Sequence, residues 1–167
     1  MKNLISPHVL LIGNPYTTIN NLKGILDEVA LENIKKAVVL EVRLLFELGI
    51  DHYSFAKSVD RKYWRQKVSR LYYAAYNIRR AVQLQDNGKY STDVSDHKDI
   101  DNLPSGLNQR TIHGAVLKQL RDDRNLADYS HLGKEEDLFA TTKELEQKVE
   151  EFLTDSKNYL KDAGIIL

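Results

Sequence analysis

The residues best suited to chemistry in this chain gather in one short stretch, positions 120–131. Three side chains there can carry positive charge, and they are interspersed with carboxylates and one tyrosine: Arg121, Arg124 and His131. Arginine is a permanent planar donor that matches phosphate oxygens, and histidine exchanges protons most readily near neutral pH. If the stretch ends a helix and turns out of it, Arg124 and His131 can converge on one patch. The pattern therefore predicts metal-independent cleavage of a phosphodiester.

RNA is the expected substrate because it carries a 2′-hydroxyl next to its own phosphate, an internal nucleophile that DNA lacks. His131 would accept that proton or deliver one to the leaving 5′-oxygen, while Arg124 would stabilise charge on the phosphoryl oxygens. Asn125 would orient the substrate or the histidine, which makes these three the predicted catalytic residues. Arg121 lies one turn before Arg124, where it can reach a flanking phosphate. The expected product is a 2′,3′-cyclic phosphate.

The same residues also have a purely structural interpretation. Cations are favoured near helix C-termini, so Arg121 and Arg124 could pair with neighbouring aspartates such as Asp128. His131 lies in a Ser-His-Leu-Gly sequence typical of an exposed turn. The sequence leaves this alternative open.

Composition limits the possible functions. The chain has 167 residues, 42% hydrophobic and 29% charged, which is enough for one domain with a full core. It contains no cysteine, which excludes disulfides, thiol catalysis and cysteine-based metal sites. No metal or cofactor is predicted, because His97 and the aspartates around it lack regular ligand spacing and indicate a surface loop. The N-terminal apolar patch is too short and too polar for a signal peptide or a membrane span, so a cytoplasmic protein without a membrane partner is expected.

The formal net charge is zero, which argues against bulk binding of nucleic acid. The charges are nevertheless unevenly placed. Residues 57–80 contain eight cations and one acid, whereas residues 134–155 contain eight acids and three lysines. Two interpretations stay open: solvated helix faces that pair with each other, or a basic groove beside the site and an acidic surface for a partner.

Apolar periodicity predicts an all-α fold, a bundle of four or five helices with one long polar loop. Residues 1–22 are predicted to form an irregular N-terminal arm with a short apolar piece at Val9–Ile12, and residues 23–167 to form the helical domain. Gly49 is expected to end the first long helix. The predicted helices cover residues 22–48, 52–59, 60–84, 109–127 and 134–161, and the polar loop covers residues 86–109.

Two apolar patterns bear on the site. In the helix predicted at 109–127, a stripe of four residues places Arg121 and Arg124 on the last turns: Ile112, Val116, Leu117 and Leu120. In the helix predicted at 60–84, for which Asp60 is a plausible N-cap, several aromatic side chains could stack RNA bases or simply pack in the core: Tyr63, Trp64, Tyr72, Tyr73 and Tyr76.

Two segments together resemble the HEPN superfamily of prokaryotic helical domains. Ser69-Arg-Leu-Tyr-Tyr-Ala-Ala-Tyr-Asn-Ile-Arg-Arg-Ala81 is similar to its R-x-Y-Y-A helix. Leu120-Arg-Asp-Asp-Arg-Asn-Leu-Ala-Asp-Tyr129 leads into its Arg-polar-x(4–6)-His signature, which reads here as Arg124-Asn125-x5-His131. The resemblance covers roughly residues 35–155.

The resemblance implies a four- to five-helix bundle that forms a homodimer, with the two Arg/His motifs facing each other in a cleft. Arg70 and Tyr129 would then contact substrate in the same cleft. Active HEPN members are metal-independent endoribonucleases of toxin–antitoxin modules, abortive infection and CRISPR-linked defence against viruses. Many are encoded beside a minimal nucleotidyltransferase that acts as the antitoxin. Other members are inactive and bind a nucleotide or a partner protein, so this alternative stays open too.

Overall fold

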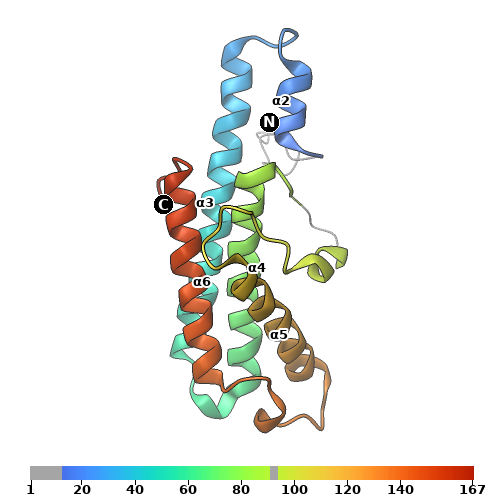
Figure 1. Ribbon diagram of the computed structural model, residues 1–167, viewed down its shortest axis with the longest axis vertical. Helices are drawn as coiled ribbons and strands as arrows, with labels where there is room; N and C mark the ends of the chain where they lie inside the picture. The colour runs from blue at the N-terminus through green and yellow to red at the C-terminus, as the bar shows by residue number, and fades with distance from the viewer. Residues whose placement is uncertain (1–12, 91–93) are drawn as a thin grey trace, which may run out of the picture.

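The computed structural model describes residues 13–90 and 94–167, and it confirms the all-α fold (Figure 1). These residues contain five α-helices: α2 Pro15–Leu22, α3 Glu28–Ser58, α4 Trp64–Asn87, α5 Arg110–Tyr129 and α6 Thr142–Asp162. Three short 3-10 helices connect them: η1 Arg61–Tyr63, η2 Val94–Asp99 and η3 Glu135–Asp137. None of the helices in these ranges is both long enough and apolar enough to cross a membrane.

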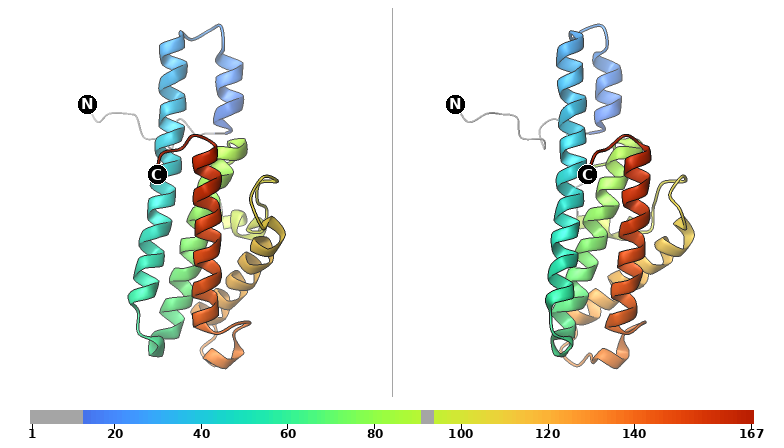
Figure 2. Two further views of the ribbon diagram at one scale, coloured as in Figure 1. Left: turned by 60° about the vertical axis from the view of Figure 1, so that its left-hand side comes forward. Right: turned by 90° about the vertical axis from the view of Figure 1, so that its left-hand side faces the viewer.

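Helix α4 forms the centre of the bundle. The helices α3, α5 and α6 all pack against it, with α3, α4 and α6 side by side and α5 crossing obliquely (Figure 2). Its buried apolar residues lie on several sides of the helix: Val68, Leu71, Tyr72, Ala74, Ala75, Tyr76, Ile78, Ala81, Val82 and Leu84. The buried side chains of α4 are therefore enclosed by three neighbouring helices.

Helix α3 runs through Gly49, so the prediction that this glycine ends a helix was wrong. Gly49 is buried where α3 crosses α4. A Cβ atom there would lie 2.6 Å from Cγ1 of Ile78 and 3.0 Å from the carbonyl oxygen of Ala74. The absence of a side chain lets the two helices approach closely, and the tertiary contact outweighs glycine's weak helix propensity.

The N-terminal arm is partly helical, in contrast to the predicted irregular arm over residues 1–22. Asn14 caps α2, because its side-chain oxygen accepts hydrogen bonds from the N–H groups of Tyr16 and Thr17 at 3.0 and 3.2 Å. The Tyr16 hydroxyl donates to the carbonyl oxygen of Gln85 at 2.8 Å and ties α2 to the end of α4. The apolar piece at 9–12 lies outside the described residues.

The predicted polar loop at 86–109 contains more structure than its composition indicates. Helix α4 extends to Asn87, and Gly88 ends it in the left-handed conformation with a φ of 71°. Three apolar side chains from the later part of the loop are buried in the core: Ile100, Leu103 and Leu107. The Arg79 guanidinium donates to the carbonyl oxygen of Asp99 at 2.8 Å, which fastens η2 to α4.

The last predicted helix begins later than expected. Thr141 and Glu144 form a capping box at the start of α6, and η3 lies before it. The basic and acidic segments pair across the bundle, as one of the two interpretations of the charge pattern predicted: Lys57 with Glu150 at 3.8 Å, Arg61 with Glu135 at 3.1 Å and Lys67 with Glu146 at 2.6 Å.

Candidate functional site

Helix α5 carries the predicted site on its last two turns. Val116, Leu117 and Leu120 are buried as predicted, but Ile112 is 57% exposed. At that turn His113 points inward instead, and its Nε2 lies 2.9 Å from a carboxylate oxygen of Asp155 on α6.

Arg124 is held by three polar neighbours. Its Nη2 donates to the hydroxyl of Tyr73 on α4 at 2.8 Å, and its Nη1 donates to Oδ1 of Asn125 at 3.2 Å. Its Nε lies 2.7 Å from a carboxylate oxygen of Asp128, which is an ion pair by distance although the N–H direction does not make it a hydrogen bond. The structure therefore joins the two segments that carry the HEPN resemblance, and Ser69 adds a weak contact to Asp128 at 3.5 Å.

Aromatic rings also surround the Arg124 guanidinium. Its central carbon lies 5.6 Å from the ring centre of Tyr72, 5.5 Å from that of Tyr73 and 5.1 Å from that of Tyr129, within the range of cation–π attraction. Partial burial acts to lower the pKa of Arg124, but Tyr73, Asp128 and Tyr129 together raise it by more, so the net pKa is above the ordinary value. Arg124 is a fixed positive charge.

Beside Arg124 lies an open cavity of about 390 Å³. Eight residues from α4, α5 and the end of η2 line it: Tyr72, His97, Lys98, Arg121, Asp122, Arg124, Asn125 and Tyr129. Arg121 reaches it from one turn earlier on α5 and hydrogen-bonds to Asp122 at 2.9 and 3.0 Å. Tyr129 is 72% exposed, so its ring is available to a ligand. Four predicted site residues thus share one cavity.

The cavity lining does not include His131, which is exposed in the turn after α5. Arg65 donates to the carbonyl oxygens of Ala127 and Gly133 at 2.6 Å each and holds the turn to the end of α5. The turn also packs against Leu126, because a Cβ on Gly133 would lie 3.0 Å from the Leu126 side chain. The polar contacts of Arg124 are with Tyr73, Asn125 and Asp128, and His131 is not part of the cavity that Arg124 lines.

Arg70 also lies outside the cavity lining. Its Nη1 is 3.4 Å from Nδ1 of His52, and its guanidinium lies 5.4 Å from the ring centre of Phe55, both on α3. The His52 ring in turn lies 5.8 Å from that of Tyr73. Arg70 is thus separated from Arg124 by Tyr73 and faces the α3 side of α4.

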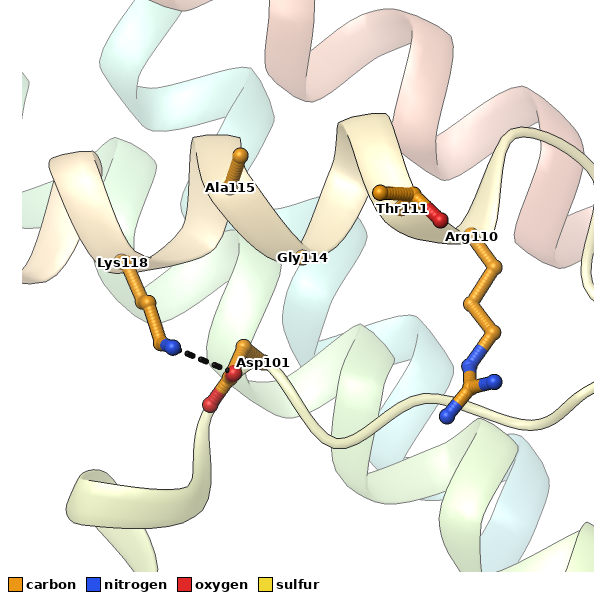
Figure 3. Close-up of a pocket in the computed structure, with 6 residues that line it drawn as sticks. All are labelled: Asp101, Arg110, Thr111, Gly114, Ala115 and Lys118. Atoms are coloured by element: carbon orange, nitrogen blue, oxygen red, sulfur yellow. Dashed lines mark ion pairs between the residues drawn. The ribbon is translucent and has the colours of Figure 1, made fainter.

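A second cavity, of about 430 Å³, opens near the start of α5 (Figure 3). The side chain of Arg110 extends towards the loop that carries Asp101, and Lys118 forms an ion pair with Asp101 at 2.6 Å. The hydrogen bond from Lys118 lowers the pKa of Asp101 against the opposing effect of burial. One of the two cations in this second cavity is already paired, and no aromatic or histidine side chain lines it. The second cavity is therefore a weaker candidate for a catalytic site.

Sequence reasoning missed His97 and Lys98 as parts of the site and left the role of the tyrosines open. Tyr72 is 1% exposed and belongs to the core, as the packing interpretation predicted. Tyr73 is half-buried and holds Arg124. The role of Tyr73 could have been inferred from the resemblance, because the two segments that carry it pack against each other through Tyr73 and Arg124. The described residues contain no group of three or more histidine, aspartate or glutamate side chains placed to hold a metal ion.

No family model, no curated protein and no solved structure matches the chain. The candidate site is therefore judged on its own residues.

Proposed function

We propose that this chain is a metal-independent endoribonuclease that cleaves RNA by attack of the 2′-hydroxyl. The observation that carries the proposal is the cavity in which Arg121, Arg124, Asn125 and Tyr129 meet. Arg124 is charged, held on three sides and half-buried, which is the arrangement that stabilises charge developing on a phosphoryl group. Arg121 would bind the same or a flanking phosphate, and Tyr129 would stack against a base.

The biological role is proposed from the resemblance of residues 69–81 and 120–129 to HEPN domains. A ribonuclease of that kind would act in the cytoplasm as the toxin of a toxin–antitoxin or antiphage defence system. Its activity would be neutralised by an antitoxin, for which a nucleotidyltransferase-like protein is the partner that the resemblance implies.

A homodimer is part of the same proposal, and an exposed apolar stripe on α3 supports it. The stripe consists of four residues that helical geometry places on one side: Leu40, Leu44, Leu48 and Phe55. Their exposed fractions range from 43% to 51%. Arg70 packs over Phe55 at the border of this stripe, so a partner bound there would lie close to Arg70, one of the three predicted substrate contacts.

A second candidate function is binding of a nucleotide without cleavage. The observation in its favour is that Arg124 already has the partners Asp128, Tyr73 and Asn125. Such a site would combine cations for phosphate with the exposed ring of Tyr129 for a base. It predicts stabilisation of the fold by a nucleotide but no change in RNA.

The deciding experiment is cleavage of a single-stranded oligoribonucleotide by the purified protein in EDTA, with wild type compared with Arg124→Ala. We expect the variant to lose about 100-fold to 1,000-fold in rate, the usual effect of removing one group that stabilises transition-state charge. Arg110→Ala, which removes a cation from the other cavity of the same helix, is the matched control. A substrate with 2′-deoxy sugars should resist cleavage. Intact RNA with wild type, or equal cleavage by Arg124→Ala, would refute the proposal.

A further inference from the structure

The histidine that shares the cavity with Arg121 and Arg124 is His97. It lies in η2, about 25 positions before those arginines in the sequence. Its Nδ1 is hydrogen-bonded with the hydroxyl of Tyr72. Its ring stacks on Tyr76, with centroids 4.3 Å apart and 23° between the planes. Both tyrosines belong to α4, so the imidazole is positioned by the central helix of the fold.

His97 is partly buried, and two buried tyrosines hold its ring. Tyr72 and Tyr76 are only 1% and 8% exposed, and both contact the imidazole on the side of the core. His97 also lines the cavity that Arg124 lines. His131 has neither feature, since it is exposed in the turn after α5 and is not part of this lining.

We propose that His97 is the catalytic proton-transfer residue of this cavity, acting with Arg124, and that His131 does not take part in the reaction. The inference rests on the endoribonuclease activity proposed above and replaces the histidine that the sequence motif indicates. The substrate it implies is a single RNA strand with its scissile phosphate between Arg124 and His97.

The reaction can be written with its protons accounted for. In the tautomer that donates Nδ1–H to the Tyr72 oxygen, Nε2 of His97 carries the lone pair. Nε2 takes the proton of the 2′-hydroxyl as the bond between O2′ and phosphorus forms. The bond between phosphorus and O5′ breaks, and the leaving oxygen takes a proton from water. The products are a 2′,3′-cyclic phosphate and a 5′-hydroxyl, and His97 returns its proton to the solvent.

Tyr72 is a positioning residue in this scheme. Burial, with a smaller contribution from Tyr76, raises the pKa of the Tyr72 hydroxyl above its ordinary value, although Arg124 opposes the shift. The phenol therefore keeps its own proton at neutral pH and does not compete for the one that His97 accepts. Its hydrogen bond fixes the ring orientation, as the third group of a catalytic triad does.

The test compares four proteins under single-turnover conditions in EDTA: wild type, His97→Ala, His97→Asn and His131→Ala. Asparagine keeps an amide that can hydrogen-bond with Tyr72 but cannot exchange protons. Both His97 variants should lose about 100-fold to 10,000-fold in rate, the range for general acid–base catalysis. Added imidazole should restore part of the rate of His97→Ala, which a purely structural role would not allow. His131→Ala should cleave at a rate close to that of wild type.

The outcomes separate this inference from the function on which it rests. If wild type cleaves RNA and the His97 variants cleave equally well, the inference fails while the ribonuclease stands. Restoration of the rate by asparagine, without any effect of imidazole, would show that His97 only supports the fold, and this also overturns the inference. Loss of activity in His131→Ala alone would return the role to His131. Absence of cleavage by wild type would refute both proposals, and thermal unfolding of each variant identifies any failure to fold.

Discussion

Replacing Gly49 by alanine tests a close contact between the two longest described helices, α3 and α4. Two effects oppose each other. Alanine is favoured over glycine in a helix interior by about 1 kcal/mol. Against this, the new Cβ would lie 2.6 Å from Cγ1 of Ile78, which belongs to a branched buried side chain, and 3.0 Å from the backbone oxygen of Ala74. Overpacking of this kind costs about 1–3 kcal/mol, so we expect a net loss of about 1 kcal/mol.

Urea unfolding followed by circular dichroism measures this loss, and a double-mutant cycle isolates its cause. In the Ile78→Ala background the contacts with the isoleucine side chain are gone and only the 3.0 Å contact with the Ala74 oxygen remains. Gly49→Ala should then become stabilising, by less than the helix-propensity gain of about 1 kcal/mol. In thermal unfolding, a loss of 1 kcal/mol corresponds to a decrease of about 2–4 °C for a chain of this size. The sign reversal between the two backgrounds is the informative result.

A stabilising effect of Gly49→Ala in the wild-type background would refute this reasoning. It would mean that α3 and α4 are farther apart at this position than the structure shows. A helix that ended at Gly49, as the sequence alone suggested, would give a different pattern, because the substitution would then have the same effect with isoleucine or alanine at position 78.

Two further predictions concern a buried carboxylate and the exposed stripe. Asp123 is 1% exposed and accepts a hydrogen bond from the Phe139 N–H at 2.9 Å. Burial raises the pKa of Asp123 in the folded state. Its stabilising contribution is therefore present at low pH and is lost as pH rises through the folded-state pKa. Urea unfolding should show the stability of wild type relative to Asp123→Asn falling as pH rises from 4 to 8, and a constant difference would contradict it. The double variant Leu44→Glu, Leu48→Glu should sediment as a monomer, whereas Lys161→Glu on α6 should stay dimeric; a dimeric double variant would place the interface elsewhere.

The fold class followed from the sequence because helical periodicity is a local property of long amphipathic segments. The errors occur where a distant contact decides the local structure. In the sequence Gly49 indicates the end of a helix, and only the contact with Ile78 shows why a glycine lies inside α3. The composition of the segment at 86–109 indicates a polar loop, although its own residues Ile100 and Leu103 are buried in the core. Composition averaged over a window does not register two or three anchoring residues.

The candidate site was predictable in part for the same reason. Three of the predicted site residues are close in sequence and lie on one helix: Arg121, Arg124 and Asn125. The prediction of that helix was therefore enough to predict that they lie near each other. Tyr73 became part of the site only because α4 packs against α5. His97 lies in another segment, and nothing in its own neighbourhood in the sequence marks it as a partner of Arg124.

The position of the site on α4 has a consequence for how it would work. Tyr72 packs in the core, contacts Arg124 through its ring and hydrogen-bonds with His97 through its hydroxyl. Tyr73, the next residue, binds Arg124. Two adjacent residues of the central helix thus set the positions of the cation and the imidazole relative to each other. Small errors in the placement of catalytic groups reduce the rate strongly. The contacts of α4 with both Arg124 and His97 therefore favour that pair over a pair of Arg124 with a histidine in an exposed turn.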